Sequence, residues 1–199
     1  PLLEPTPEET EDGEFEIPER TNLDSYASTA SAGRLNNGEV RDLENIDLDD
    51  GSYTRSRALL LMNAERTRNT RSVGRYLEEL MEVEENRYNP VFLSKRARWH
   101  ANQGNYNAAL RDAQKAEQHW ARITPDLVFD TKSEIYEVQA ASYQGLFYAS
   151  EDDLEKLDRA IRGWLKFLRH VSSRSRMDLV ASAEDQLAKL EYAKQRLER

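Results

Sequence analysis

The 199-residue sequence contains no cysteine. Disulfide bonds, thiolate catalysis and cysteine-ligated zinc are therefore excluded for this chain. Because proteins without cysteine occur in both reducing and oxidising compartments, this absence does not indicate where the protein resides.

Long apolar runs are missing as well. The run from Leu59 to Met62 is far shorter than the ~20 residues that a membrane-spanning helix needs. Residues 1–20 lack the basic start and the apolar middle of a secretory signal peptide. We therefore expect no membrane span, and we favour a cytoplasmic over an exported location.

Glycine and proline are scarce beyond residue 53. Those that interrupt this part of the chain are Gly74, Pro90, Gly104, Pro125, Gly145 and Gly163. So few turn-forming residues argue against many short strands. A composition with 33% charged and 38% hydrophobic residues also suits helices that each bury one apolar stripe. The predicted fold class is all-α.

The net charge of -9 conceals a division of the chain. Residues 1–50 contain 15 Asp and Glu against three Arg, whereas residues 51–199 contain 22 acidic and 25 basic residues. From this division we predict an acidic, largely disordered tail over residues 1–50 and a helical domain over residues 51–199. The small positive balance of the domain gives little support for a nucleic-acid surface, so we expect no nucleic-acid partner.

Apolar residues in the tail lie among acidic ones. Phe15 and Ile17 alternate with glutamates, and a second cluster consists of Leu43, Ile46 and Leu48. This composition is typical of short segments that dock onto a groove of a protein. For the second cluster an alternative stays open, in which it leads into the domain and packs on the first helix.

Apolar residues at helical spacing predict three helix pairs followed by a last helix. The first pair begins near Tyr53 and is broken at residues 68–70, the second spans residues 89–123, and the third extends from about residue 127 to about residue 168. The last helix begins near Met177, and its apolar spacing suits a helix that covers the open end of a stack.

The second pair carries the most regular pattern. Its turn is Gly104-Asn105-Tyr106, its first helix contains Ala97, and its second helix has small residues at Ala109, Ala113 and Ala116. This pattern resembles a tetratricopeptide repeat, which is a helix pair with a period of about 34 residues. The resemblance implies an antiparallel helical stack whose concave face holds a peptide or another protein. We therefore expect an interaction scaffold.

The flanking pairs match this pattern less well. A shift of 36 residues toward the N-terminus moves the three alanines onto Val73, Leu77 and Leu80, which are all apolar. A shift of 51 residues toward the C-terminus is needed to reach Ala160, Trp164 and Phe167. The third pair therefore has either lengthened helices or an inserted turn.

The resemblance also implies which helix face lines the groove. The residues on that face in the first two pairs are Asn63, Arg66, Ser94, Arg98 and Asn102. The amide and guanidinium groups among them can hydrogen-bond an extended backbone and pair with carboxylates. The alternative is a solvated face without a ligand. An acidic tail beside a slightly basic domain favours a role, in which the tail docks on its own domain or on a second copy.

Signals of catalysis are weak. His100, His119 and His170 are isolated, and the sequence has neither a His-Glu-x-x-His motif nor a phosphate-binding glycine loop. We expect no enzyme activity, no metal and no cofactor. His100 lies on the packing stripe of its helix and is interpreted as a hydrogen-bonded core residue.

Two further alternatives stay open. The aromatic residues of the third pair could form a small-molecule site of a regulatory or catalytic domain, although a role as the core of that pair is simpler. These residues are Tyr136, Tyr143, Phe147, Trp164 and Phe167. The last helix could also mediate self-association into a homo-oligomer.

Overall fold

The computed structural model describes residues 23–150, 153–174 and 176–199. In these ranges the chain forms nine α-helices and three short 3-10 helices, and it contains no strand. The helices are α1 (Asp24–Ser31), α2 (Asn37–Glu44), α3 (Tyr53–Arg66), α4 (Thr70–Glu82), η1 (Glu84–Tyr88), α5 (Pro90–Asn102), α6 (Tyr106–Gln118), η2 (Trp120–Arg122), η3 (Pro125–Leu127), α7 (Val128–Tyr148), α8 (Leu154–Ser172) and α9 (Met177–Leu197). The all-α prediction is confirmed.

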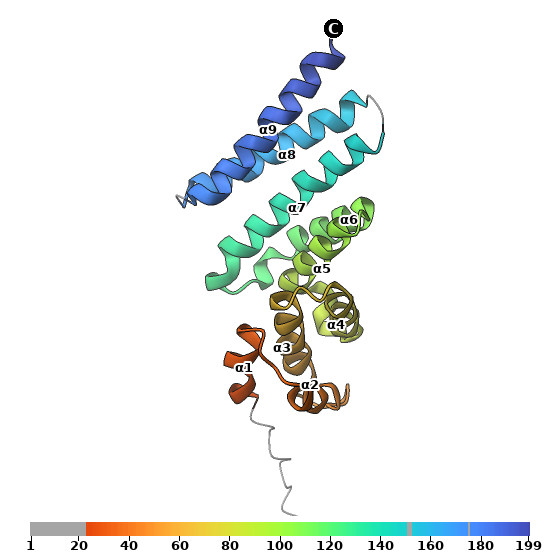
Figure 1. Ribbon diagram of the computed structural model, residues 1–199, viewed down its shortest axis with the longest axis vertical. Helices are drawn as coiled ribbons and strands as arrows, with labels where there is room; N and C mark the ends of the chain where they lie inside the picture. Colours follow the sequence, from red (N-terminus) through yellow and green to blue (C-terminus); the bar gives the residue numbers. More distant parts are fainter. Residues whose placement is uncertain (1–22, 151–152, 175) are drawn as a thin grey trace, which may run out of the picture.

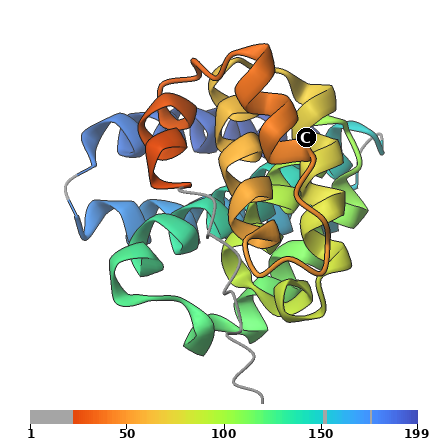
Figure 2. The same cartoon turned by 90° about the horizontal axis from the view of Figure 1, so that it is seen from below.

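The helices stack one after another along a single direction (Figure 1). The pairs α3–α4, α5–α6 and α7–α8 each pack as a hairpin, and α9 packs on α8 at the C-terminal end. Seen along the stack from its N-terminal end, α1 lies beside α3 (Figure 2). Each helix therefore packs on helices that lie one or two places away in the chain, as in a helical repeat protein.

The core follows the stack as three successive apolar clusters. The first includes Leu43, Leu60 and Leu77, and the clusters after it join α4 to α7 and α7 to α9. On α9 the buried residues are Ala183, Leu187 and Leu190, which recur at helical spacing. The predicted role of this helix as a cover for the end of the stack is confirmed.

One type of turn closes three of the helices. Gly33, Arg68 and Gly104 follow α1, α3 and α5, and all three have a positive φ, of 68°, 56° and 76°. The spacing between them is 35 and then 36 residues. After each helix the chain makes the same two backbone hydrogen bonds, for example from Asn69 N to Ala64 O at 2.9 Å and from Arg68 N to Glu65 O at 3.2 Å. The helical unit therefore recurs with a period of 35 to 36 residues from α1 to α5.

Residues 23–50 differ from the expected disorder, because they form α1 and α2. Leu23, Ala30 and Leu43 are buried in the first apolar cluster. The side chain of Asn36 accepts hydrogen bonds from the first turn of α2, and the Glu39 carboxylate accepts one from Asn36 N in return. Residues 1–22, which include Phe15 and Ile17, lie outside the described residues.

The third pair is longer than the second. Helices α7 and α8 have 21 and 19 residues, whereas α5 and α6 have 13 each. Ala160, Trp164 and Phe167 are buried at the positions that the longer shift predicts. Of the two alternatives that the sequence left open for this pair, lengthened helices or an inserted turn, the structure shows lengthened helices.

Arg68 occupies a backbone conformation that glycine occupies in the other two turns. A left-handed conformation costs an L-residue roughly 1–2 kcal/mol, and part of this cost is offset because glycine loses more entropy on folding. We predict that Arg68→Gly raises the free energy of unfolding by about 0.5 kcal/mol. The matched reverse change is Gly104→Ala, where a Cβ atom would meet no heavy atom within 4 Å. It should lower stability by about 1 kcal/mol for purely conformational reasons.

Urea denaturation of the two variants and the wild type measures both effects. A loss of stability in Arg68→Gly would show that packing of the Arg68 side chain outweighs its backbone strain.

Candidate functional site

A pocket of about 390 Å³ lies where the first helix pair meets the second. We call it the α3–α5 pocket. Its residues come from the end of α3, the turn that follows, the start of α4 and one face of α5. They are Glu65, Arg68, Thr70, Val73, Lys95, Arg98, Trp99 and Asn102.

Trp99 provides a fixed apolar wall of this pocket. Its indole Nε1 donates a hydrogen bond to the backbone carbonyl of Thr70 at 3.1 Å. The ring packs against Gly74 of α4, where an added Cβ would lie only 2.5 Å from a ring atom. Any larger residue at position 74 would displace the ring, so Gly74 permits the close contact between α4 and Trp99.

The charged residues of the α3–α5 pocket differ in what they already bind. Lys95 Nζ pairs with the Glu65 carboxylate at 2.8 Å, so these two charges neutralise each other. Arg98 binds Glu134 and Glu137 of α7, each at 2.7 Å. Arg68, by contrast, is exposed and makes no ion pair with any residue that the structure describes.

The electrostatic state of Arg98 follows from its two acidic partners. Burial disfavours the charged form, but Glu134 and Glu137 outweigh burial and hold the pKa of Arg98 above its ordinary value. Two of the five N–H donors of Arg98 bind these carboxylates, so its positive charge is compensated inside the fold. Among the described residues, Arg68 is the pocket cation whose charge no carboxylate compensates.

The five predicted groove residues do not form one surface. Arg98 and Asn102 line the α3–α5 pocket. Ser94 is fully buried, and its hydroxyl lies 2.9 Å from a Glu134 oxygen. The Asn63 side chain accepts a hydrogen bond from Leu35 N at 3.2 Å, and Arg66 lies beside Gly33. Two neighbouring helices explain this separation, because α1 covers one side of α3 and α7 packs against α5.

Arg68, Lys95 and Trp99 are pocket residues that the sequence did not indicate. A signal for Arg68 was present, because the 36-residue shift aligns it with Gly104 and so places a bulky residue at a glycine position. The sequence carries no signal that distinguishes Trp99 from an aromatic residue that only packs. Lys95 carried no signal, since its neighbour Glu65 comes from the previous helix pair.

A second pocket of about 350 Å³ lies between α6, α7 and α8. Most of its lining residues are polar or charged, and Tyr143 is the lining residue that belongs to the aromatic group of the third pair; the others are Gln114, Glu117, Gln139, Arg159, Arg162, Gly163 and Lys166. Lys166 and Gln139 both bind the Glu117 carboxylate, at 2.9 and 3.0 Å. Burial raises the pKa of Glu117, but these two bonds outweigh it and leave the pKa lowered.

Most of the aromatic group of the third pair belongs to the core. Phe147, Trp164 and Phe167 are buried, with exposed fractions of 7%, 4% and 1%. Tyr136 is partly covered by Lys166, whose Nζ lies 4.1 Å from the ring centre. For these four residues, the structure agrees with the interpretation that the aromatic group forms the core of the third pair.

The three histidines are separate from one another. His100 lies 3.8 Å from Asp112, and burial lowers its pKa. His119 contacts the Tyr88 ring, and His170 stacks on Phe129. Within the described ranges no group of His, Asp and Glu is arranged to hold a metal ion. The same residues include no helix that is long and apolar enough to cross a membrane.

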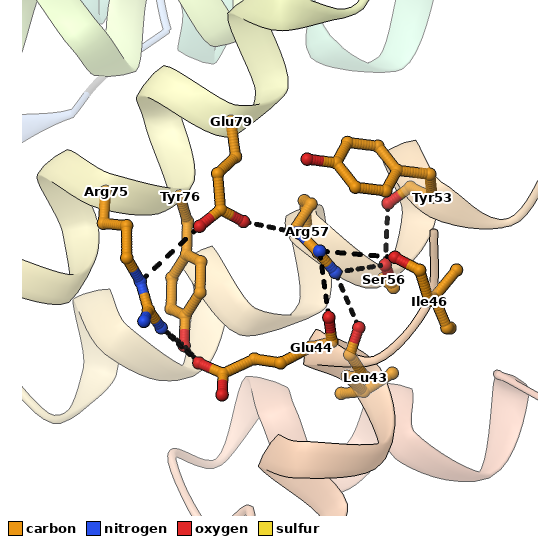
Figure 3. A network of polar contacts seen from close by, with 9 residues as sticks. All are labelled: Leu43, Glu44, Ile46, Tyr53, Ser56, Arg57, Arg75, Tyr76 and Glu79. Carbon is orange, nitrogen blue, oxygen red and sulfur yellow. Dashed lines mark hydrogen bonds and ion pairs between the residues drawn. The ribbon is translucent and has the colours of Figure 1, made fainter. Parts of the chain in front are cut away.

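The segment Leu43–Leu48 belongs to the fold at the end of α2. Leu43 is fully buried, Ile46 packs against the first apolar cluster, and Leu48 is 51% exposed. The Arg57 guanidinium donates hydrogen bonds to the carbonyls of Leu43 at 2.6 Å and of Glu44 at 3.1 Å (Figure 3). For Leu43 and Ile46 the structure therefore has the second alternative, in which they pack on the first helix of the domain.

The Glu44 side chain links α2 to α4 in the same network (Figure 3). Its Oε1 accepts a hydrogen bond from the Tyr76 hydroxyl at 2.7 Å and also pairs with Arg75. Burial and the bond to Glu44 raise the pKa of Tyr76 to about 12. Burial raises the pKa of Glu44 too, but the bonds from Tyr76 and Arg75 outweigh it, so the pKa of Glu44 is lowered.

Comparisons with protein-family models, with curated proteins and with solved structures gave no match to this chain. A functional conclusion for this chain therefore rests on the observed geometry alone.

The lowered pKa of Glu44 predicts how stability depends on acidity. Because the folded state has the lower pKa, the bonds of Glu44 stabilise the fold fully above its ordinary pKa of 4.5, and this stabilisation is lost as the pH falls through the lowered value. We predict that Glu44→Gln makes the loss of stability between about pH 5 and about pH 3 shallower than in the wild type.

The control is Glu191→Gln, which changes an exposed glutamate on α9. Urea denaturation at each pH gives the slopes. Equal slopes in wild type and Glu44→Gln would show that the network around Tyr76 does not depend on the charge of Glu44.

Proposed function

We propose that this chain is a tetratricopeptide-like scaffold that binds an acidic, extended segment of a protein partner in the α3–α5 pocket. The observation that carries the proposal is Arg68, an exposed arginine at a left-handed turn position where the equivalent turns have glycine. The role is one of binding rather than catalysis.

The recurring architecture supports the first part of the proposal. Turns with the same hydrogen bonds recur after 35 and 36 residues, close to the tetratricopeptide period of about 34. The motif from Gly104 to Leu110 begins at the last of these turns. Stacks of helix pairs of this kind form extended surfaces that proteins use to bind partners.

The strain at Arg68 supports the second part. A non-glycine residue in this conformation costs of order 1–3 kcal/mol, and such residues cluster at ligand-binding sites. Glycine in the same turn would remove this cost. Because Arg68 forms no ion pair with the described residues, its guanidinium remains available to a carboxylate from outside the fold.

The other pocket residues indicate the chemistry of the ligand. Trp99 and Val73 provide apolar contact area, and the exposed amide of Asn102 can hydrogen-bond a peptide backbone. Lys95 and Arg98 are already paired with carboxylates of the fold, so Arg68 is the pocket cation that no carboxylate of the described residues compensates. A ligand with a carboxylate beside an apolar residue matches this combination.

Immobilised peptides test the proposed function. We predict that the full chain retains ten-residue peptides with glutamates around a central Phe, and that it does not retain the same peptides with glutamine in place of glutamate. Arg68→Gly and Asn102→Ala should each weaken retention, Arg68→Gly by about tenfold, which corresponds to the loss of one charge-assisted hydrogen bond of about 1.4 kcal/mol. Arg71→Gln is the control, because Arg71 is exposed on α4 and does not line the pocket.

Since Arg68→Gly is expected to stabilise the fold, weaker retention by this variant cannot be explained by unfolding. Equal retention of glutamate and glutamine peptides, or equal binding by Arg68→Gly and the wild type, would contradict the proposal.

A further inference from the structure

We infer that the natural occupant of the α3–α5 pocket includes a segment of this same chain, Glu14-Phe15-Glu16-Ile17-Pro18-Glu19, which we call the acidic segment. It lies outside the described residues. The inference rests on the proposed function, because it names an occupant for the same pocket. The pocket is then a regulated site, in which a partner must displace the acidic segment.

Within this chain, the acidic segment is the candidate occupant of the pocket that the fold leaves available. Of the two clusters of apolar residues among acidic ones, Leu43 and Ile46 are already packed between α2 and α3. Their cluster is held by the hydrogen bonds of Arg57 near the start of α3 and is not available to a pocket at the end of that helix. Phe15 and Ile17 are the apolar residues of the other cluster.

The acidic segment and the α3–α5 pocket are complementary in charge and in apolar surface. Residues 1–22 contain eight acidic residues and one Arg, and three of the acidic residues alternate with apolar ones in the acidic segment. The pocket combines Arg68, which pairs with no carboxylate of the described residues, with the apolar surfaces of Trp99 and Val73. Glutamates beside Phe15 and Ile17 therefore bring carboxylates toward Arg68 when the apolar side chains contact Trp99.

The anchor of the segment lies close to the pocket. Leu23 is buried against the first cluster, and Asp24 pairs with Arg55 in the first turn of α3. Glu65 of the pocket is ten residues further along α3, or about 15 Å at 1.5 Å per residue. The pocket also lies about one helix spacing, 8–10 Å, away from the anchor across the helix axes, so the path from Leu23 to the pocket is about 20 Å.

The chain between the anchor and the acidic segment is long enough for this path. Ile17 is six residues and Phe15 eight residues before Leu23, and extended chains of these lengths span up to about 20 and about 27 Å. The acidic segment therefore reaches the pocket of its own molecule. A tether of this kind gives an effective concentration of at most the order of millimolar, which favours docking within one molecule over docking between molecules.

A single spin label tests this inference in the full chain. Since the sequence contains no cysteine, Gly13→Cys creates one labelling site beside the acidic segment and removes no carboxylate. We predict that a nitroxide at this position broadens the NMR signals of the Trp99 indole and of the Asn102 side-chain amide, and that it leaves the signals of α9 sharp.

The charge dependence of the broadening identifies the contact. Broadening at the pocket should be lost in Arg68→Gly, and it should be lost in about 1 M salt, where the screening length falls to about 3 Å. It should persist in Arg71→Gln. In a mixture of labelled chains with separate, isotope-enriched unlabelled chains, the pocket signals should stay sharp, because docking is within one molecule.

Three results would overturn the inference: sharp pocket signals in the labelled chain, broadening that Arg68→Gly does not change, or broadening that occurs in the mixture. Sharp signals together with retention of glutamate peptides would leave the proposed function standing while the inference fails. If the inference holds, glutamate peptides displace the acidic segment from the wild-type chain, and changing Glu14, Glu16 and Glu19 to Gln should strengthen their retention. Absence of peptide retention in both chains would contradict the proposed function itself.

Discussion

A buried arginine joins the N-terminal end of the stack to the rest of the molecule. Arg57 of α3 is 7% exposed; it donates hydrogen bonds to the last carbonyls of α2 and pairs with Glu79 of α4 at 2.5 Å. Carbonyls at a helix end lack partners within the helix, and a buried charge without partners costs several kcal/mol. Arg57 satisfies both needs at once, so α2, α3 and α4 are stable in this arrangement only together.

The position of the α3–α5 pocket follows from this arrangement. With α1 and α2 held against α3, one side of α3 is covered, and the side toward α5 remains open near the turn at Arg68. Gly74 admits the Trp99 ring, which closes the floor of the pocket, while Glu134 and Glu137 draw Arg98 toward α7. Arg98, which the sequence favoured as a binding residue, is thus paired inside the fold, and Arg68 of the turn stays exposed to solvent.

The sequence predicted the helices that carry a complete apolar stripe and missed those that depend on distant contacts. Helices α3 to α9 have that stripe, so periodicity located them. Helices α1 and α2 have eight residues each, too few to be stable alone. Helix α1 is held by Ala30 in the first apolar cluster, and α2 is held by Leu43 and by the hydrogen bonds of Arg57. In an acidic, proline-containing region, composition indicated disorder instead.

The candidate site was predictable only in part, for a related reason. The sequence put Arg98 and Asn102 on one helix face, and both line the pocket, because helical spacing determines which residues share a face. The partners of Ser94 and Arg98 are 36 to 40 residues away on α7, and a single sequence gives no sign of such pairs. The repeat period aligns Arg68 with Gly104, so the sequence contains a signal for Arg68. The sequence does not show that the turn at Arg68 is left-handed, which the structure does.

Native-state hydrogen exchange of α2 tests most directly whether residues 23–50 belong to the stack. The amides of Val40 and Asn45 donate hydrogen bonds within and at the end of α2. The account predicts that they are protected in the wild type, and that Arg57→Met removes this protection while α7, α8 and α9 keep theirs. Unprotected α2 amides in the wild type, or unchanged protection in Arg57→Met, would contradict it.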